Sequence, residues 1–191
     1  MTLPDAAGAP SGDARLRAAG IRVVALDVDG TLTDGTIFIG PAGEAMKGFS
    51  VHDGFGLTLL REAGLRLAIV TGRGSAIVEA RAAELRFDAV LQRVKDKAAA
   101  LAELGRRFGC PTQAIAYMGD DWPDLPAFSV AGLAAAPAGA SAPVLAGAHW
   151  VSTRPAGAGA VREFAEWLLE TRGDLATLLA RHRDGTGASA Q

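Results

Sequence analysis

The chain has 191 residues, of which 49% are hydrophobic and 21% are charged, and this composition excludes a mainly disordered protein. The formal net charge of −2 excludes the strongly basic surface that binds nucleic acids or anionic membranes. A single cysteine, Cys110, excludes a disulfide framework within one chain and a CxxC metal site.

The length predicts one domain with tails. Residues 1–20 are expected to form an N-terminal tail, because Ala, Gly, Pro and Ser dominate residues 1–14. This segment lacks the apolar run of a secretory signal, which predicts a cytoplasmic protein. Residues 21–173 are expected to form the globular domain, and residues 174–191 a C-terminal helix and a disordered tail.

Within the domain, short apolar runs alternate with amphipathic segments. The apolar runs predict strands, at residues 23–26, 67–70, 89–91, 115–118, 133–135 and 150–151. The amphipathic segments predict helices, at residues 56–63, 75–85, 96–108, 123–130, 159–171 and 174–181. Apolar residues on both sides of Pro41-Ala42-Gly43 predict a β-hairpin over residues 36–49. The alternation indicates a Rossmann-like α/β fold of three layers, with helices on both faces of a mainly parallel sheet.

Residues 125–153 carry no Lys, Arg, Asp or Glu and are long enough to span a bilayer. Pro126, Pro137 and Pro143 interrupt this stretch, so we expect short buried strands and turns and no membrane span. The arginines are dispersed and aromatic residues make up 6% of the chain, so we expect no nucleic-acid partner.

Acidic residues follow the first predicted strand, in the segment Asp27-Val-Asp-Gly-Thr-Leu-Thr-Asp34. Asp27 and Asp29 are two residues apart, which tends to place both carboxylates on one side of an extended backbone. Close carboxylates repel each other, so a shared proton or a cation is expected, and hard oxygen ligands favour Mg²⁺. Gly30 lets the chain turn sharply and approach a ligand. The alternative is a turn with solvated acidic side chains.

A second acidic segment, Gly119-Asp-Asp-Trp-Pro-Asp124, follows the strand predicted at residues 115–118. The carboxyl ends of parallel strands lie at one edge of the sheet, where ligands bind, so both acidic segments are expected there. The alternative is a helix start with Asp121 as N-cap before Pro123. Both interpretations can hold, because the cap and a metal ligand would be different residues.

Two further segments suit a phosphate group. Thr71-Gly72-Arg73 follows the strand at residues 67–70, and a hydroxyl with free N–H groups at such a turn can bind a phosphate oxygen. Lys97 opens the helix after the strand at residues 89–91, where an ammonium group would balance carboxylates and phosphoryl charge. Each feature alone is commonly structural, and Lys95 is an alternative to Lys97 on spacing.

Taken in order, these four segments resemble the four motifs of the haloacid dehalogenase superfamily. Residues from about 21 to 172 resemble its branch without a cap domain that includes the 3-deoxy-D-manno-octulosonate 8-phosphate phosphatases. The stretches that carry this resemblance are Lys47-Gly-Phe-Ser-Val-His-Asp-Gly54, Ile69-Val-Thr-Gly-Arg-Gly-Ser-Ala-Ile-Val78 and Gly157-Ala-Gly-Ala-Val-Arg-Glu163. The resemblance implies a Mg²⁺-dependent phosphatase that hydrolyses this sugar phosphate through an aspartyl-phosphate, in the synthesis of lipopolysaccharide precursors.

The resemblance also implies roles for particular residues. Asp27 would be the nucleophile and Asp29 the general acid and base. Asp120 would bind Mg²⁺ together with the Asp27 carboxylate and the Asp29 backbone carbonyl. Other implied roles are phosphate binding by Thr71, Gly72 and Lys97, support behind the metal ligands by Asp121 and Asp124, and substrate contacts by Lys47, His52 and Arg73.

Two positions depart from the family pattern. Members that act on the sugar 8-phosphate often carry Arg where this chain has His52. Their C-terminal glycine motif usually begins with two glycines, and here Ala156 replaces the first. Both positions lie away from the residues of phosphoryl chemistry, so they bear on the substrate and not on the reaction.

The gap between Asp34 and the next predicted helix can hold a hairpin but no cap domain. An open site admits water and discriminates poorly, and the resemblance implies that the hairpin at residues 36–49 packs against a neighbouring subunit in a homotetramer. The residues expected at that surface are Ile37, Phe38, Ile39, Met46 and Phe49. The alternative is that they complete the core of their own subunit.

Two other functions stay open on the sequence. A related nine-carbon keto-sugar 9-phosphate is the alternative substrate, and the substrate contacts and the hairpin would decide between the two sugars. The other alternative is a noncatalytic oligomerisation module of the same fold, against which the complete set of motif residues argues.

Overall fold

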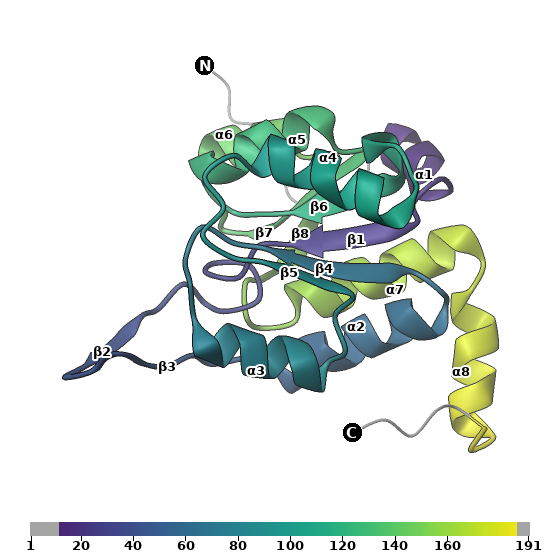
Figure 1. The fold of residues 1–191 in the computed structure, drawn as a ribbon. Helices are drawn as coiled ribbons and strands as arrows, with labels where there is room; N and C mark the ends of the chain where they lie inside the picture. The colour runs from purple at the N-terminus through teal and green to yellow at the C-terminus, as the bar shows by residue number, and fades with distance from the viewer. Residues whose placement is uncertain (1–11, 187–191) are drawn as a thin grey trace.

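The computed structural model describes residues 12–186, which form an α/β domain around a six-stranded sheet (Figure 1). The strands lie in the order β5-β4-β1-β6-β7-β8, and each adjacent pair is parallel. Their bounds are β1 Val23–Leu26, β4 Arg66–Val70, β5 Ala89–Leu91, β6 Ile115–Met118, β7 Leu133–Ala138 and β8 Trp150–Pro155. The strand order reverses around β1, which places a ligand crevice at the carboxyl ends of β1 and its neighbours.

Helices cover both faces of the sheet, so the predicted three-layer, Rossmann-like architecture is confirmed (Figure 1). One face carries α4 (Lys97–Phe108), α5 (Leu125–Val130) and α6 (Ala142–Gly147), and the other carries α2 (Val51–Glu62), α3 (Ala76–Glu84) and α7 (Ala160–Arg172). Both α1 (Gly12–Ala18) and α8 (Leu175–Arg183) pack against α7. Two short 3₁₀ helices, η1 (Thr112–Ala114) and η2 (Trp122–Asp124), precede β6 and α5.

Alternate residues of each central strand enter different halves of the core. Val24 and Leu26 of β1 pack on the side of α2 and α7, whereas Val23 and Ala25 pack on the side of α4 and α5. Each of these four residues is at most 1% exposed. A strand buried on both faces requires an apolar residue at every position, which is why the polar residues begin only where the strand ends.

The N-terminal segment differs from its prediction. Residues 12–18 were expected to belong to a tail, but they form α1, which buries Ala14 and Ala18 in the core. Two alanines four residues apart form a stripe too small to stand out in a segment rich in Ala and Gly. The remainder of the expected tail, residues 1–11, and residues 187–191 at the other end lie outside the described residues.

One helix differs in its extent from the prediction, and another is additional to it. The helix expected from residue 56 begins at Val51, because Ser50 caps it by accepting a hydrogen bond from the Asp53 N–H (3.3 Å). The uncharged stretch over residues 125–153 contains α6, which was not predicted, between β7 and β8. No helix in the described part of the chain is both long and apolar enough to cross a membrane.

The predicted hairpin consists of β2 (Phe38–Gly40) and β3 (Gly43–Met46), which pair only with each other and project from the domain (Figure 1). Four of its apolar side chains are exposed, and we call them the hairpin surface: Ile37, Phe38, Ile39 and Met46. They do not complete the core of their own subunit. Phe49 does pack against that core, so it belongs to the domain and not to the hairpin surface.

Candidate active site

Acidic side chains meet at the carboxyl ends of the adjacent strands β1 and β6. The two strands pair in register, and the Asp27 N–H donates to the Met118 carbonyl (3.0 Å) just beyond them. Carboxylate oxygens of Asp27, Asp120 and Asp124 lie within 4.8 Å of one another. Asp27 and Asp124 are buried and Asp120 is half-buried, so their mutual repulsion is only weakly screened by water.

Lys97 is the cation of this cluster. Its Nζ lies 3.0 Å from Asp27 Oδ1 and also contacts Asp124. Burial alone would lower the pKa of Lys97, but the neighbouring carboxylates Asp27 and Asp124 raise it, so the ammonium stays charged. Lys95, the alternative on spacing, is exposed. The structure thus brings Lys97 to the acidic residues, as the sequence predicted.

Asp124 links the cluster to the segment after β6. One of its oxygens accepts hydrogen bonds from the backbone N–H groups of Asp120 (2.9 Å) and Asp121 (3.1 Å). The other accepts from the Tyr117 hydroxyl (2.6 Å) and contacts Lys97. Burial, and then the charge of Asp124, raises the pKa of Tyr117, so this hydroxyl stays protonated and donates. Asp124 therefore holds Lys97 and the Asp120 backbone in place.

The cluster contains more negative than positive charge. Burial raises the pKa of Asp27 to about 6, against the lowering effect of Lys97. Burial likewise raises the pKa of Asp120 to about 7, and the charges of Asp27 and Asp124 add to this effect. One ammonium faces three carboxylates, so a divalent cation would stabilise their ionised forms. These oxygen donors fit Mg²⁺.

Gly30 and Thr31 shape the loop that leads away from Asp27. Gly30 has a φ of +90°, a left-handed conformation that other residues rarely adopt, and a Cβ there would collide with the Asp120 carboxylate. The Thr31 Oγ1 donates to Asp120 Oδ1 (3.1 Å). The sharp turn expected at Gly30 is present, and the loop lies directly against Asp120 of the second acidic segment.

Thr71 lies on the other side of β1, at the end of β4, and is buried. Its N–H donates to the Leu91 carbonyl (2.9 Å), and its carbonyl accepts from the Val94 N–H (3.1 Å). These backbone hydrogen bonds place its side chain and the following Gly72 at the same edge of the sheet as the carboxylates.

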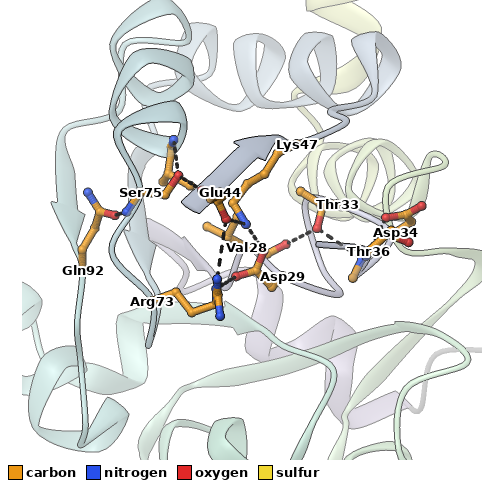
Figure 2. Close-up of polar contacts among 12 residues, drawn as sticks. Val28, Asp29, Thr33, Asp34, Thr36, Glu44, Lys47, Arg73, Ser75 and Gln92 are labelled. Carbon is orange, nitrogen blue, oxygen red and sulfur yellow. Dashed lines mark hydrogen bonds and ion pairs between the residues drawn. The ribbon is translucent and has the colours of Figure 1, made fainter. Parts of the chain in front are cut away.

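Asp29 faces a group of polar side chains from the hairpin and from the segment after β4 (Figure 2). Lys47 contacts Asp29, and its Nζ lies 2.8 Å from Glu44 Oε1. Arg73 Nε lies 3.5 Å from Asp29 Oδ2. Ser75, the N-cap of α3, donates to Glu44, and the hydrogen bonds from Lys47 and Ser75 lower the pKa of Glu44. Glu44 therefore ties the hairpin to the edge that carries Asp29.

The third proposed substrate contact lies elsewhere. His52 is exposed on the first turn of α2 and lines a cavity of about 460 Å³ together with Arg154 and Arg162. The helix-start interpretation of Asp121 also holds, since this exposed residue immediately precedes η2.

Sequence reasoning missed two residues that organise the site. Glu44 precedes Lys47 by three residues in a hairpin. This spacing alone does not indicate a shared site, because only the fold brings both side chains close to Asp29. Tyr117 lies inside the apolar run of β6, where the pattern indicates only a buried strand. Both residues are identified only by the side chains they contact in the fold, Ser75 and Arg73 for Glu44 and Asp124 for Tyr117.

Known proteins resemble this chain over most of its length. It is 39% identical over 162 residues to the 3-deoxy-D-manno-octulosonate 8-phosphate phosphatase of Yersinia pestis, covering 85% of this chain and 87% of that protein. It is 37% identical over 168 residues to the enzyme of the same name from Escherichia coli K12, covering 88% and 89%. The chain belongs to this phosphatase family. No family model matches it.

Solved structures of the family agree with the assignment. The octulosonate 8-phosphate phosphatase of Moraxella catarrhalis, in complex with magnesium, phosphate and KDO, has a TM-score of 0.87 at 37% identity, covering 90% of this chain and 99% of that one. The cobalt-bound enzyme of Haemophilus influenzae has a TM-score of 0.82 at 35% identity, covering 84% and 94%. The family consists of phosphoric monoester hydrolases, and its divalent metals agree with the cation site predicted from the sequence.

Proposed function

We propose that this protein hydrolyses 3-deoxy-D-manno-octulosonate 8-phosphate to the free sugar acid and phosphate, with Mg²⁺ as cofactor. Identity of 37–39% with phosphatases of that name, over most of their length, supports the substrate. The observation that carries the reaction is the cluster of Asp27, Asp120 and Lys97 at one sheet edge, in which Asp27 and Lys97 are buried and Asp120 is half-buried. The product would serve the synthesis of lipopolysaccharide precursors.

The proposed reaction has two displacements. In the first, an Asp27 oxygen attacks phosphorus while the bond from phosphorus to the sugar oxygen breaks, and Asp29 gives that oxygen a proton. In the second, Asp29 takes a proton from the water that attacks the aspartyl-phosphate, which releases phosphate and restores Asp27. Two displacements are easier than one direct hydrolysis. Thr71, Gly72 and Lys97 would bind the phosphoryl oxygens as their charge develops.

The residues that would hold Mg²⁺ are the carboxylates of Asp27 and Asp120 and the backbone carbonyl of Asp29. Asp121 and Asp124 would support this set from behind. When bound, the ion supplies positive charge that neutralises the phosphate group. The raised pKa values of Asp27 and Asp120 support the proposal, because they reflect buried negative charge that a cation would balance.

Two positively charged side chains, Lys47 and Arg73, are proposed to bind the acidic sugar. Lys47 and Arg73 both lie beside Asp29, where a carboxylate of the substrate would find positive partners. Glu44 holds the pair together from the hairpin side. A substrate contact by His52 stays a prediction, since this residue lines a separate cavity.

We further infer that the hairpin surface packs against a neighbouring subunit in a homotetramer. The side chains that support this are apolar and exposed, with Ile39 at 71% and Met46 at 57%. A second subunit would cover them and close an edge that no cap domain covers. A cytoplasmic location likewise stays a prediction from the sequence.

Phosphate release from a panel of sugar phosphates, with and without Mg²⁺, tests the proposed function. We expect a preference for the octulosonate 8-phosphate and no turnover without a divalent cation. Asp27→Asn keeps the size of the side chain but removes the nucleophile, so turnover should fall at least about 1,000-fold in a folded protein.

Two results would contradict parts of this proposal. A clear preference for a nine-carbon keto-sugar 9-phosphate would change the substrate and keep the reaction. Mg²⁺-dependent release by Asp27→Asn would reject the nucleophile. Asp88→Asn is the matched control, because Asp88 accepts the Leu67 N–H (2.8 Å) at the opposite end of β4 and should leave turnover unchanged.

A further inference from the structure

Asp53 is a buried carboxylate that takes no part in the proposed reaction. It lies in the first turn of α2 and is 1% exposed. Its Oδ1 accepts the Arg162 N–H (2.8 Å), and its Oδ2 accepts the Gly159 N–H (3.2 Å). The first N–H groups of a helix need an acceptor, and Gly159, the N-cap of α7, has no side chain to supply one. Asp53 therefore caps α7 from a different helix.

Residues 157–159, which we call the glycine segment, precede α7 and lie against the loop that leads away from Asp27. The Gly157 N–H donates to the Thr31 carbonyl (3.3 Å). Gly157 has a φ of +63°, and a Cβ there would lie 2.6 Å from the Asp34 nitrogen and 2.7 Å from the Thr33 carbonyl carbon. No side chain fits between the two segments, so the position of one determines the position of the other.

That loop in turn reaches the acidic cluster. The Thr31 Oγ1 donates to Asp120 Oδ1 (3.1 Å). The Thr33 N–H donates to the Val28 carbonyl (3.0 Å), which closes the loop into a tight turn. A displacement of this turn would therefore move the hydrogen-bond donor of Asp120, a residue proposed to bind Mg²⁺.

A second contact sets the distance between α2 and α7, which lie side by side (Figure 1). A Cβ on Gly56 would lie 3.0 Å from Arg162 Cα and 3.3 Å from Ala165 Cβ. An added methyl group would push the start of α7 away from α2 without replacing Asp53. Gly56 thus offers an independent way to disturb the same contact.

We infer that Asp53 is a positioning residue of the Mg²⁺ site. By capping α7 it holds the glycine segment against the Asp27 loop, and through Thr31 it holds the Asp120 carboxylate. The inference rests on the proposed function in one respect, namely that the acidic cluster binds Mg²⁺.

Calorimetric titration of the purified full-length protein with Mg²⁺, in the absence of substrate, tests this inference. Asp53→Asn keeps the shape of the side chain but offers one acceptor oxygen to two N–H groups. We expect the dissociation constant of Mg²⁺ to rise about fivefold, which corresponds to roughly 1 kcal/mol of weaker binding. Gly56→Ala should change it in the same direction.

The control for a general loss of stability is Asp88→Asn. Asp88 also accepts a backbone N–H, that of Leu67 (2.8 Å), but it lies at the opposite end of the sheet. This variant should lower Tm and leave the Mg²⁺ dissociation constant unchanged. A purely structural role of Asp53 would produce the same pattern as Asp88.

Unchanged Mg²⁺ affinity in folded Asp53→Asn and Gly56→Ala would overturn the inference, whatever their Tm. If Asp53→Asn does not fold, Gly56→Ala decides the question by the same titration. A failure of the proposed function looks different: the wild-type protein would bind Mg²⁺ but release phosphate from none of the sugar phosphates, and the inference about Asp53 would stand.

Discussion

The three carboxylates of the acidic cluster differ in what their oxygens already bind. Both oxygens of Asp124 accept hydrogen bonds within the chain, from Tyr117, Asp120 and Asp121. Asp27 contacts Lys97 through Oδ1, and a backbone hydrogen bond from Val28 also stabilises its charged form. Asp124 is therefore suited to hold its neighbours.

Tyr117→Phe tests this role of Asp124 at the scale of one residue. The variant keeps the buried ring but removes the hydroxyl that donates to Asp124 (2.6 Å). A hydrogen bond to a charged group contributes roughly 1.5–3 kcal/mol, and Lys97 remains bound, so we expect kcat to fall about tenfold. Steady-state kinetics at a temperature well below Tm measure this.

Thr58→Val is the matched control for the loss of a buried hydroxyl. The Thr58 Oγ1 donates to the Gly54 carbonyl (3.2 Å) inside α2, away from the acidic cluster. This variant should keep the wild-type kcat. A Tyr117→Phe protein with the same kcat as wild type would contradict the role assigned to Asp124.

The β2–β3 hairpin is an element held mainly by its side chains. Its strands pair only with each other, and an isolated two-stranded hairpin is marginally stable in water. Glu44 binds Ser75 of the domain, and Lys47 binds Asp29 (Figure 2). A movement of the hairpin would therefore displace Lys47, which contacts Asp29. In this way the position of the hairpin surface affects the proposed general acid and base.

Ile39→Lys combined with Met46→Lys tests the hairpin surface. Lysine cannot be buried at an interface without a partner, so we expect a species smaller than the tetramer proposed for the wild-type protein, in size-exclusion chromatography with light scattering. Leu179→Lys on α8, a residue 68% exposed, is the matched control and should leave the mass unchanged. A double variant with the wild-type mass would contradict the proposed interface.

At the scale of the whole molecule, the acidic cluster links folding to pH. Asp27 and Asp120 have pKa values of about 6 and about 7 in the folded protein, against 3.8 for an ordinary aspartate. The folded, metal-free protein therefore binds these protons more tightly than the unfolded chain does. Their contribution to the free energy of unfolding is complete below about pH 4 and is lost as the pH rises through 6 and 7.

Mg²⁺ is expected to reverse this loss, because the ion competes with protons for the same oxygens. At about 100 times its dissociation constant it adds roughly 2.7 kcal/mol to the free energy of unfolding, which corresponds to about 5–10 °C in Tm. At one fixed Mg²⁺ concentration, the gain in Tm over EDTA-treated protein should be larger near pH 8 than near pH 5.5. Asp120→Asn should abolish most of the gain, and equal gains at both pH values would contradict the linkage.

The layers of the fold could be predicted because their signals are local. A continuous apolar run such as Val23–Leu26 indicates a strand buried on both faces, wherever its neighbours lie. The segment 12–18 could not be predicted, because α1 depends on two small residues that meet α7 far along the chain. A segment without a clear hydrophobic periodicity, such as α1, forms its helix because it packs against residues far along the chain.

By itself, the sequence determined the strands of the sheet and most of the covering helices, because these depend on periodicity. It also indicated Asp27, Asp120 and Thr71 after strand ends and Lys97 at the start of α4, because these depend on position in a parallel sheet. Only the tertiary structure decided that Asp124 binds Lys97 and Tyr117, that Glu44 joins Lys47 to Ser75, and that Asp53 caps α7. The physical reason is that these contacts depend on side chains of different elements meeting, as when Asp53 reaches Arg162, and that geometry exists only after the layers have packed.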